Sequence, residues 1–261
     1  DKNAAVDGEK EPKRTIRYPA RPLWLGRGAA DPEASRWMLR LDMQNFKKTQ
    51  LGQFVLNEAR EFCEKAIEKD PLFSLAYSML AKINHSELIR FAKEDSNAIL
   101  DEMFENASKA AELDPQNPES LVMLSTYYFF KGDFTFSQNH AEKAVELNPS
   151  NPEAYMRLGL SMIHQGDYEN SEEFVRKSIE IDPLDPKIVR RKIPYFFLYM
   201  GRNDFQKAFE ITKEILEHSP NAGLVKGFKA SAMGFLDYGN EAKQALDAVS
   251  YTHLRAHETK A

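Results

Sequence analysis

Hydrophobic and small residues follow one another along the chain with the spacing of paired amphipathic helices. In residues 118–151, Leu121, Leu124 and Tyr128 stand at i, i+3 and i+7, which places them on one helical face. A turn at Gly132 and Asp133 follows, and a second apolar face is then formed by Ala141, Ala144 and Val145. The pattern predicts a first helix, a turn and a second helix, and hence an all-α structure.

A proline preceded by an acidic or polar residue closes each helix pair. These prolines lie 44, 34, 34 and 37 residues apart, at Pro71, Pro115, Pro149, Pro183 and Pro220. Proline lacks an amide hydrogen and disfavours helical angles in the residue before it, so each one ends a unit. Twelve residues before each proline stands a small or apolar residue, where two helices can approach closely: Ala59, Met103, Ser137, Ser171 and Ala208.

A helical period of 34 residues, with this order of Leu, Gly, Tyr, Ala and Pro, resembles the tetratricopeptide repeat (TPR) family from about Leu41 to Ala248. The resemblance implies a right-handed α-solenoid, in which each pair covers the apolar face of its neighbour. We therefore expect an array over residues 36–248, with about five repeats and a truncated sixth.

The units differ in how well they fit this pattern. Residues 118–151 and 152–185 fit it well. The unit at 74–117 carries ten extra residues, which we expect to lengthen its first helix. The unit at 186–222 carries three extra residues, and Pro194 should kink its first helix.

Both ends of the chain depart from the repeat. Residues 1–35 contain several prolines and show no helical period before about Asp31, so they are interpreted as an extended linker, with Trp37 packed on the first helix pair. Residues 249–261 resemble the translation of a sequencing-library adapter and are not expected to belong to the fold. On that interpretation His253 and His257 are no metal pair, although their i, i+4 spacing would suit one.

Composition excludes several classes of protein. The 35 Lys and Arg against 40 Asp and Glu give a net charge of −5, which argues against a nucleic-acid-wrapping or membrane-surface protein. No stretch approaches the roughly 20 apolar residues that span a bilayer, and the first residues lack a signal-peptide core, so we expect a soluble, cytoplasmic protein. The single cysteine, Cys63, excludes an internal disulfide.

Motifs for catalysis or metal binding are absent from the sequence. It contains no Walker loop, GxGxxG, GxSxG, HExxH or CxxC, so we expect no enzyme, no cofactor and no metal. Cys63 is expected to be a buried structural thiol. Ordinary surface or groove positions are expected for the histidines of the repeats, and a solvated helix edge for Arg190, Arg191 and Lys192.

The family resemblance implies a concave surface, made by the first helices, that binds peptides or partner helices. The positions expected to point into this groove are mostly apolar: Ser78, Lys82, Val122, Thr126, Phe129, Met156, Leu160 and Ile163. Val122 and Met156 stand where the carboxylate-binding co-chaperones of the family would need Lys or Arg. The sequence therefore favours an apolar strand or helix as the ligand.

The leading interpretation is a non-catalytic protein–protein interaction scaffold that binds a segment of a partner or of its own parent chain. The segments AREFCEKAIEKDPLFSLAYSMLAKIN and KAVELNPSNPEAYMRLGLSMIHQGDYENSEEFVRKSIEIDPLDP also resemble the C-terminal TPR regions of bacterial class III adenylate cyclases and of transmembrane winged-helix regulators. That resemblance implies a regulatory region of a larger protein. A nucleic-acid-binding repeat is the remaining alternative.

Overall fold

The computed structural model describes residues 51–91, 96–183, 188–236 and 240–244. Within these ranges every long element is a helix and no strand occurs. The helices are α2 (Leu51–Lys69), α3 (Ser74–Phe91), α4 (Ser96–Leu113), α5 (Pro118–Phe130), α6 (Phe134–Leu147), α7 (Pro152–His164), α8 (Tyr168–Glu180), α9 (Ile188–Gly201), α10 (Phe205–His218) and α11 (Gly223–Phe235). The linker 1–35, Trp37 and the tail 249–261 lie outside the described residues.

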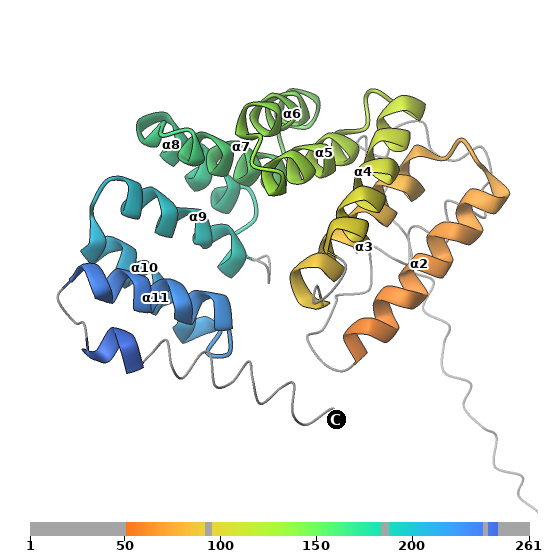
Figure 1. Ribbon diagram of the computed structural model, residues 1–261. Coiled ribbons are helices and arrows are strands. Elements are labelled where there is room, and N and C mark those ends of the chain that lie inside the picture. The colour runs from red at the N-terminus through yellow and green to blue at the C-terminus, as the bar shows by residue number, and fades with distance from the viewer. Residues whose placement is uncertain (1–50, 92–95, 184–187, 237–239, 245–261) are drawn as a thin grey trace, which may run out of the picture.

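Consecutive helices pack side by side, and the row of helices curves into an arch (Figure 1). The first helices of the pairs are α3, α5, α7, α9 and α11, and each packs against its own second helix or the second helix of the unit before it. First helices also contact one another, from α3 through to α11. The first helices therefore form one continuous layer, which lies on the inner side of the arch.

The turn inside each pair is built the same way three times. Gly132 (φ 78°), Gly166 (φ 88°) and Asn203 (φ 59°) adopt left-handed backbone angles, which glycine and asparagine tolerate best. The next residue is an aspartate that caps the second helix by accepting a hydrogen bond from an amide three residues on: Asp133, Asp167 and Asp204. These turns match those that the sequence pattern places between the helices.

Asparagines begin two of the first helices and also connect repeats. Asn117 and Asn151 cap α5 and α7, each directly before a proline at the first helical position. The Asn117 side chain also donates hydrogen bonds to the hydroxyls of Ser74 (2.7 Å) and Ser78 (2.8 Å) on α3. The cap of one unit is thus joined to the start of the preceding first helix.

The core is a chain of small apolar clusters, each shared by consecutive helices. Ala141 of α6 packs with Leu158 of α7, and Val175 of α8 packs with Ile163 and Leu198. A further cluster joins α9, α10 and α11 through Phe196, Ala208 and Ala232. Because every cluster needs side chains from two units, an isolated pair would leave its apolar face in water.

Two expectations about the irregular units have different outcomes. The extra residues of the unit at 74–117 do lengthen its first helix, since α3 has 18 residues where α5 and α7 have 13, and they lengthen α4 to 18 residues as well. The helix α9 continues through Pro194 to Gly201. Pro194 therefore lies inside the helix, and the kink expected there stays a prediction.

The close approach of α7 and α8 at a glycine supplies a stability prediction. A Cβ on Gly159 of α7 would lie 2.7 Å from Val175 Cγ2 and 3.1 Å from the Ser171 carbonyl oxygen on α8. We expect Gly159→Ala to lower the free energy of unfolding by about 1–3 kcal/mol through overpacking. Thermal and urea unfolding followed by circular dichroism would measure the change.

The matched control is Gly227→Ala in α11, where an added Cβ meets nothing within 4 Å. Alanine favours helix over glycine by about 0.8–1 kcal/mol, so this variant should be neutral or more stable. Equal destabilisation by the two substitutions would contradict the close α7–α8 contact.

Candidate functional site

The apolar positions expected to form the floor of the groove are covered by neighbouring side chains. Val122 and Thr126 are fully buried, and Met156, Leu160 and Ile163 are also buried, as is Ser78. Lys82 and Phe129 are half-buried. A ligand on the concave face can therefore reach Phe129 and Lys82, whereas the other predicted residues lie beneath the surface. Their role in peptide binding stays a prediction.

Small residues explain why the floor is covered. Val122 belongs to a cluster that includes Ala81 of α3 and Ala154 of α7, whose short side chains let the flanking first helices approach. Ile163 is part of the core between α7, α8 and α9. The Thr126 hydroxyl donates to the Val122 carbonyl at 2.7 Å, which satisfies its hydrogen bonding without water.

A group of charged side chains lies on the concave face instead, and we call it the concave charge cluster. It consists of Lys82 and His85 of α3, Glu119 of α5, Glu153 and Arg157 of α7, and Arg190 of α9. Lys82 Nζ lies 3.8 Å from Glu119 Oε2, and Arg190 Nη2 donates to Glu153 Oε2. Arg157 Nη2 lies 3.7 Å from Glu153 Oε1. Four of the first helices are thus linked through ionic contacts and hydrogen bonds.

One contact in the cluster crosses over α5. Arg157 Nη2 of α7 lies 3.2 Å from His85 Nε2 of α3. A guanidinium can only donate, so Nε2 is the acceptor and the imidazole is neutral. Burial lowers the pKa of His85 well below its usual value, and the charges of Arg157 and Arg190 lower it further. His85 therefore serves here as an uncharged acceptor.

Glu153 is the anion on which the two arginines depend. Burial alone would raise its pKa, but the positive charges of Arg190 and Arg157 outweigh this effect and lower the pKa to about 2. Burial lowers the pKa of Arg157 to about 10, although Glu153 opposes the shift. Both groups are charged at neutral pH, because each stabilises the ionised form of the other.

The basic run at residues 190–192 is not the solvated helix edge that the sequence suggested. Arg190 pairs with Glu153, and Lys192 pairs with Glu214 of α10. Arg191 is buried, and its Nη1 lies 3.4 Å from the Ser178 carbonyl oxygen and 3.3 Å from that of Asp182. These side chains point in different directions and fasten α9 to its neighbours, so they do not form a basic patch.

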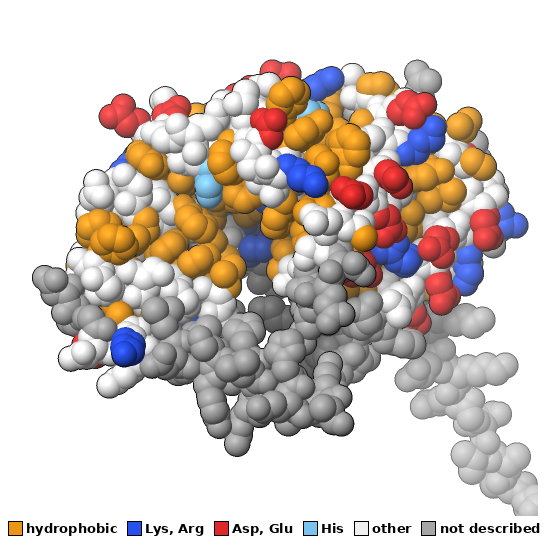
Figure 2. Space-filling view, in the orientation of Figure 1, with side chains coloured by type: hydrophobic (Ala, Val, Ile, Leu, Met, Phe, Trp, Pro, Cys, Tyr) orange, Lys and Arg blue, Asp and Glu red, His pale blue; other side chains and the backbone are white. Residues whose placement is uncertain are grey.

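Aromatic side chains form a second feature of the concave face, which we call the aromatic strip. The rings contact one another from α3 to α11, with centroid separations of 4.8 to 6.2 Å along the series His85, Phe130, Phe129, His164, Phe197 and Phe228. Phe130 is 42% exposed and His164 is exposed, while Phe129 and Phe197 are half-buried. Figure 2 shows orange side chains gathered around a hollow in this view. Phe130 and His164 thus offer aromatic surface that the other described residues leave exposed.

The acidic and basic members of the cluster could have been found in the sequence. Glu119 and Glu153 each follow the proline that begins a first helix, so they hold the same place in two repeats. Arg157 stands one turn after Glu153, at i+4, where opposite charges attract. The groove positions expected from the sequence include Lys82 of this cluster but none of these three residues. The contacts with His85 and Arg190 depend on the curvature of the array, which no local pattern reveals.

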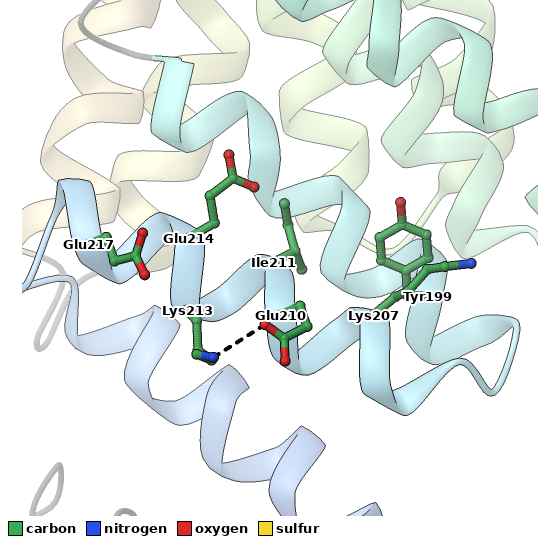
Figure 3. A pocket seen from close by; sticks show the side chains of 7 residues that line it. All are labelled: Tyr199, Lys207, Glu210, Ile211, Lys213, Glu214 and Glu217. Carbon is green, nitrogen blue, oxygen red and sulfur yellow. Dashed lines mark hydrogen bonds and ion pairs between the residues drawn. The ribbon is translucent and has the colours of Figure 1, made fainter.

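A shallow hollow of about 420 Å³ lies elsewhere, between α9 and α10 (Figure 3). Its lining is mostly charged: Tyr199, Lys207, Glu210, Ile211, Lys213, Glu214 and Glu217. The lysines have partners, since Lys213 lies 3.3 Å from Glu210 and Lys207 lies 2.8 Å from Asp204. We therefore regard this hollow as a solvated surface.

Other candidate chemistries find little support in the described residues. Among them, no group of three or more His, Cys, Asp or Glu side chains could hold a metal ion. Burial raises the pKa of the Cys63 thiol to about 12, which confirms the structural thiol expected from the sequence. The helices that the structure describes are all too short or too polar to cross a bilayer.

Comparisons with known proteins give one family match, to the central part of the chain. Residues 122–186 match the family model of the tetratricopeptide repeat. No curated protein matches the sequence significantly.

Solved structures with a similar fold include TPR proteins from two bacteria. The protein from Parabacteroides merdae superposes with a TM-score of 0.53 at 16% identity, over 84% of this chain and 79% of that one. The protein from Thermus thermophilus gives 0.56 at 15% identity, over 77% and 98%. PilW, described as a type IV pilus biogenesis factor, gives 0.62 at 14% identity, over 85% and 94%. Together with the helix pairing, these findings show an all-α solenoid of TPR repeats.

The low pKa of Glu153 makes a prediction about acid stability. A carboxyl group whose pKa is lower in the folded protein stabilises it above the unfolded pKa, and this contribution is lost as pH falls toward the folded pKa. Between pH 4.5 and about 2, we expect the wild type to lose about 3 kcal/mol more unfolding free energy than Glu153→Gln. Urea unfolding at a series of pH values would measure the difference.

At pH 7 the same substitution leaves Arg157 and Arg190 without their anion and should cost about 3–5 kcal/mol. The control is Glu180→Gln, which removes an exposed pair with Arg176 and should cost under about 1 kcal/mol. Parallel pH profiles for the wild type and Glu153→Gln would refute the role assigned to Glu153.

Proposed function

We propose that this chain is a non-catalytic scaffold for protein–protein interaction, and that its concave face binds an extended or helical segment of a partner along the aromatic strip. A TPR solenoid is itself typical of proteins that bind protein partners. The observation that carries the finer proposal is the exposure of Phe130 and His164 in a continuous series of aromatic rings.

Exposed aromatic rings suit this role energetically. Burial of apolar surface contributes about 25 cal/mol per Å², and large aromatic side chains dominate many interfaces. The half-buried rings Phe129 and Phe197 are held by their neighbours, so little side-chain freedom would be lost on binding. The strip is therefore a preorganised apolar surface, and Phe129 is its one member that the sequence also suggested for the groove.

The most strongly perturbed titratable groups favour binding over catalysis. Cys63 is fully buried with a raised pKa, so it is a poor nucleophile. His85 is held neutral between arginines, where a general base would have to become cationic. We infer structural roles for both groups.

The partner segment belongs either to another protein or to the parent chain of this array. In the second case the array would be the regulatory region of a larger adenylate cyclase or transcriptional regulator, as the resemblance of two of its segments implies. Nucleic acid is the weaker alternative, because Arg190 and Lys192 already pair with carboxylates. A cytoplasmic location is part of the same proposal.

Selection from a random library of 12-residue peptides displayed on phage would test the proposal. We expect the chain to select peptides that the variant Phe130→Asp binds at least about tenfold more weakly, because a carboxylate would interrupt the aromatic strip. The matched control is Phe136→Asp on α6, where the phenylalanine is similarly exposed, at 51%, but lies on a second helix. Binding constants would be measured by fluorescence anisotropy with the synthetic peptides.

Circular dichroism would establish that both variants keep the helical content of the wild type. Failure to select any peptide would overturn the proposal, and so would an equal loss of peptide affinity in the control variant Phe136→Asp. Tight binding of single-stranded RNA that weakens steeply with added salt would favour the nucleic-acid alternative instead.

A further inference from the structure

We propose that the concave charge cluster binds an acidic side chain of the partner segment, next to an apolar residue that occupies the aromatic strip. This inference rests on the proposed function and names the chemistry of its ligand. It differs from the sequence-based expectation of an apolar ligand. The occupant is one Asp or Glu inside a peptide segment.

The charges of the cluster do not balance. Lys82, Arg157 and Arg190 supply three positive charges, and Glu119 and Glu153 supply two negative ones. His85 adds none, since its imidazole accepts a hydrogen bond from Arg157. The cluster therefore carries one positive charge in excess, which a single carboxylate would neutralise.

Two guanidinium groups of the cluster keep buried hydrogen-bond donors without an acceptor among the described residues. Arg157 is only 5% exposed, yet among the described residues its Nε has no hydrogen-bond partner, and the buried Nε of Arg190 has none there either. Glu153 Oε1 also lacks a hydrogen bond, because Arg157 Nη2 lies 3.7 Å away, beyond hydrogen-bonding distance. Buried polar groups are normally paired, so this guanidinium pair has donor capacity that its own glutamate does not use.

Two cations of the cluster are accessible to a ligand. The side chains of Lys82 and Arg190 are 42% and 34% exposed, whereas Arg157 lies behind them. In Figure 2 the hollow in this face has Lys or Arg side chains within it. An incoming carboxylate would meet the exposed cations first, and its charge would be partly shielded from water by the surrounding helices.

The cluster and the aromatic strip adjoin and have His85 in common, so the groups that they bind must be neighbours in the ligand. The Arg157 guanidinium carbon lies 6.0 Å from the centroid of Phe129, and His85 contacts both Arg157 and Phe130. An acidic residue held by the cluster would therefore place its sequence neighbours over the strip. A polyanion such as RNA fits less well, because Glu119 and Glu153 would repel its further phosphates.

The peptides selected by phage display provide the probe. They are joined to the coat protein through their C-termini, so any acidic group that is selected must be a side chain. We expect an Asp or Glu beside an aromatic or aliphatic residue, and we expect its replacement by Asn or Gln in the synthetic peptide to weaken binding about tenfold. A library with free C-termini, selected in parallel, would reveal a preference for a terminal carboxylate.

Variants of the chain then connect the acidic residue to the cluster. Lys82→Gln and Arg190→Gln should each weaken binding of the selected peptide (the acidic peptide) several-fold. Neither variant should change binding of the peptide in which Asn or Gln replaces the acidic residue (the amide peptide). The four affinities form a double-mutant cycle. Arg176→Gln, an exposed arginine on α8, should change neither. Glu119→Gln keeps an oxygen for the hydrogen bond from Asn151 and removes a competing charge, so it should bind the acidic peptide more tightly.

The outcomes separate this inference from the proposed function. Selected peptides that need Phe130 for binding but contain no acidic residue would overturn the inference and leave the scaffold proposal standing. The same holds if the Lys82 and Arg190 variants weaken binding of the acidic and amide peptides equally. Tighter binding through terminal carboxylates alone would also overturn it. Peptides indifferent to Phe130 would overturn both.

Discussion

The structure depends on burial of apolar surface between successive helix pairs. No pair encloses a core of its own within the described residues, because clusters such as that of Ile163, Val175 and Leu198 take side chains from two units. Small residues set the distance between packed helices. At Gly159, α7 and α8 lie so close that an added methyl group would clash with Val175. The curvature of the array follows from these contacts, and so does the set of side chains that its inner face presents.

That curvature determines what the concave face presents. As the first helices approach one another, Val122 and Ile163 are covered, and charged and aromatic side chains from α3 to α9 are brought together above them. Glu153 remains ionised because the two arginines are there, and its charge in turn opposes the lowering of the Arg157 pKa by burial. The same packing that stabilises the solenoid therefore creates a surface with aromatic rings beside a small excess of positive charge.

Much of the fold could be predicted from sequence, since it is local. The prolines, the Gly-Asp turns and the small residues each act within one unit, so their spacing identified the helix pairs and the TPR fold. The site was harder to predict for a physical reason. Whether Val122 is exposed depends on Ala81 and Ala154 in other repeats, and the pairing of Arg190 with Glu153 spans two first helices. The position of each residue within its repeat was predictable, but its burial by side chains of the neighbouring repeats was not.

A crystal structure of the chain bound to a selected peptide would test the central claim most directly. We expect peptide density along α5, α7 and α9, with the apolar side chains of the peptide on Phe130 and His164 and with Val122 and Met156 still covered. Peptide bound on the second helices, or a groove opened so that the ligand packs on Val122 and Met156, would contradict it.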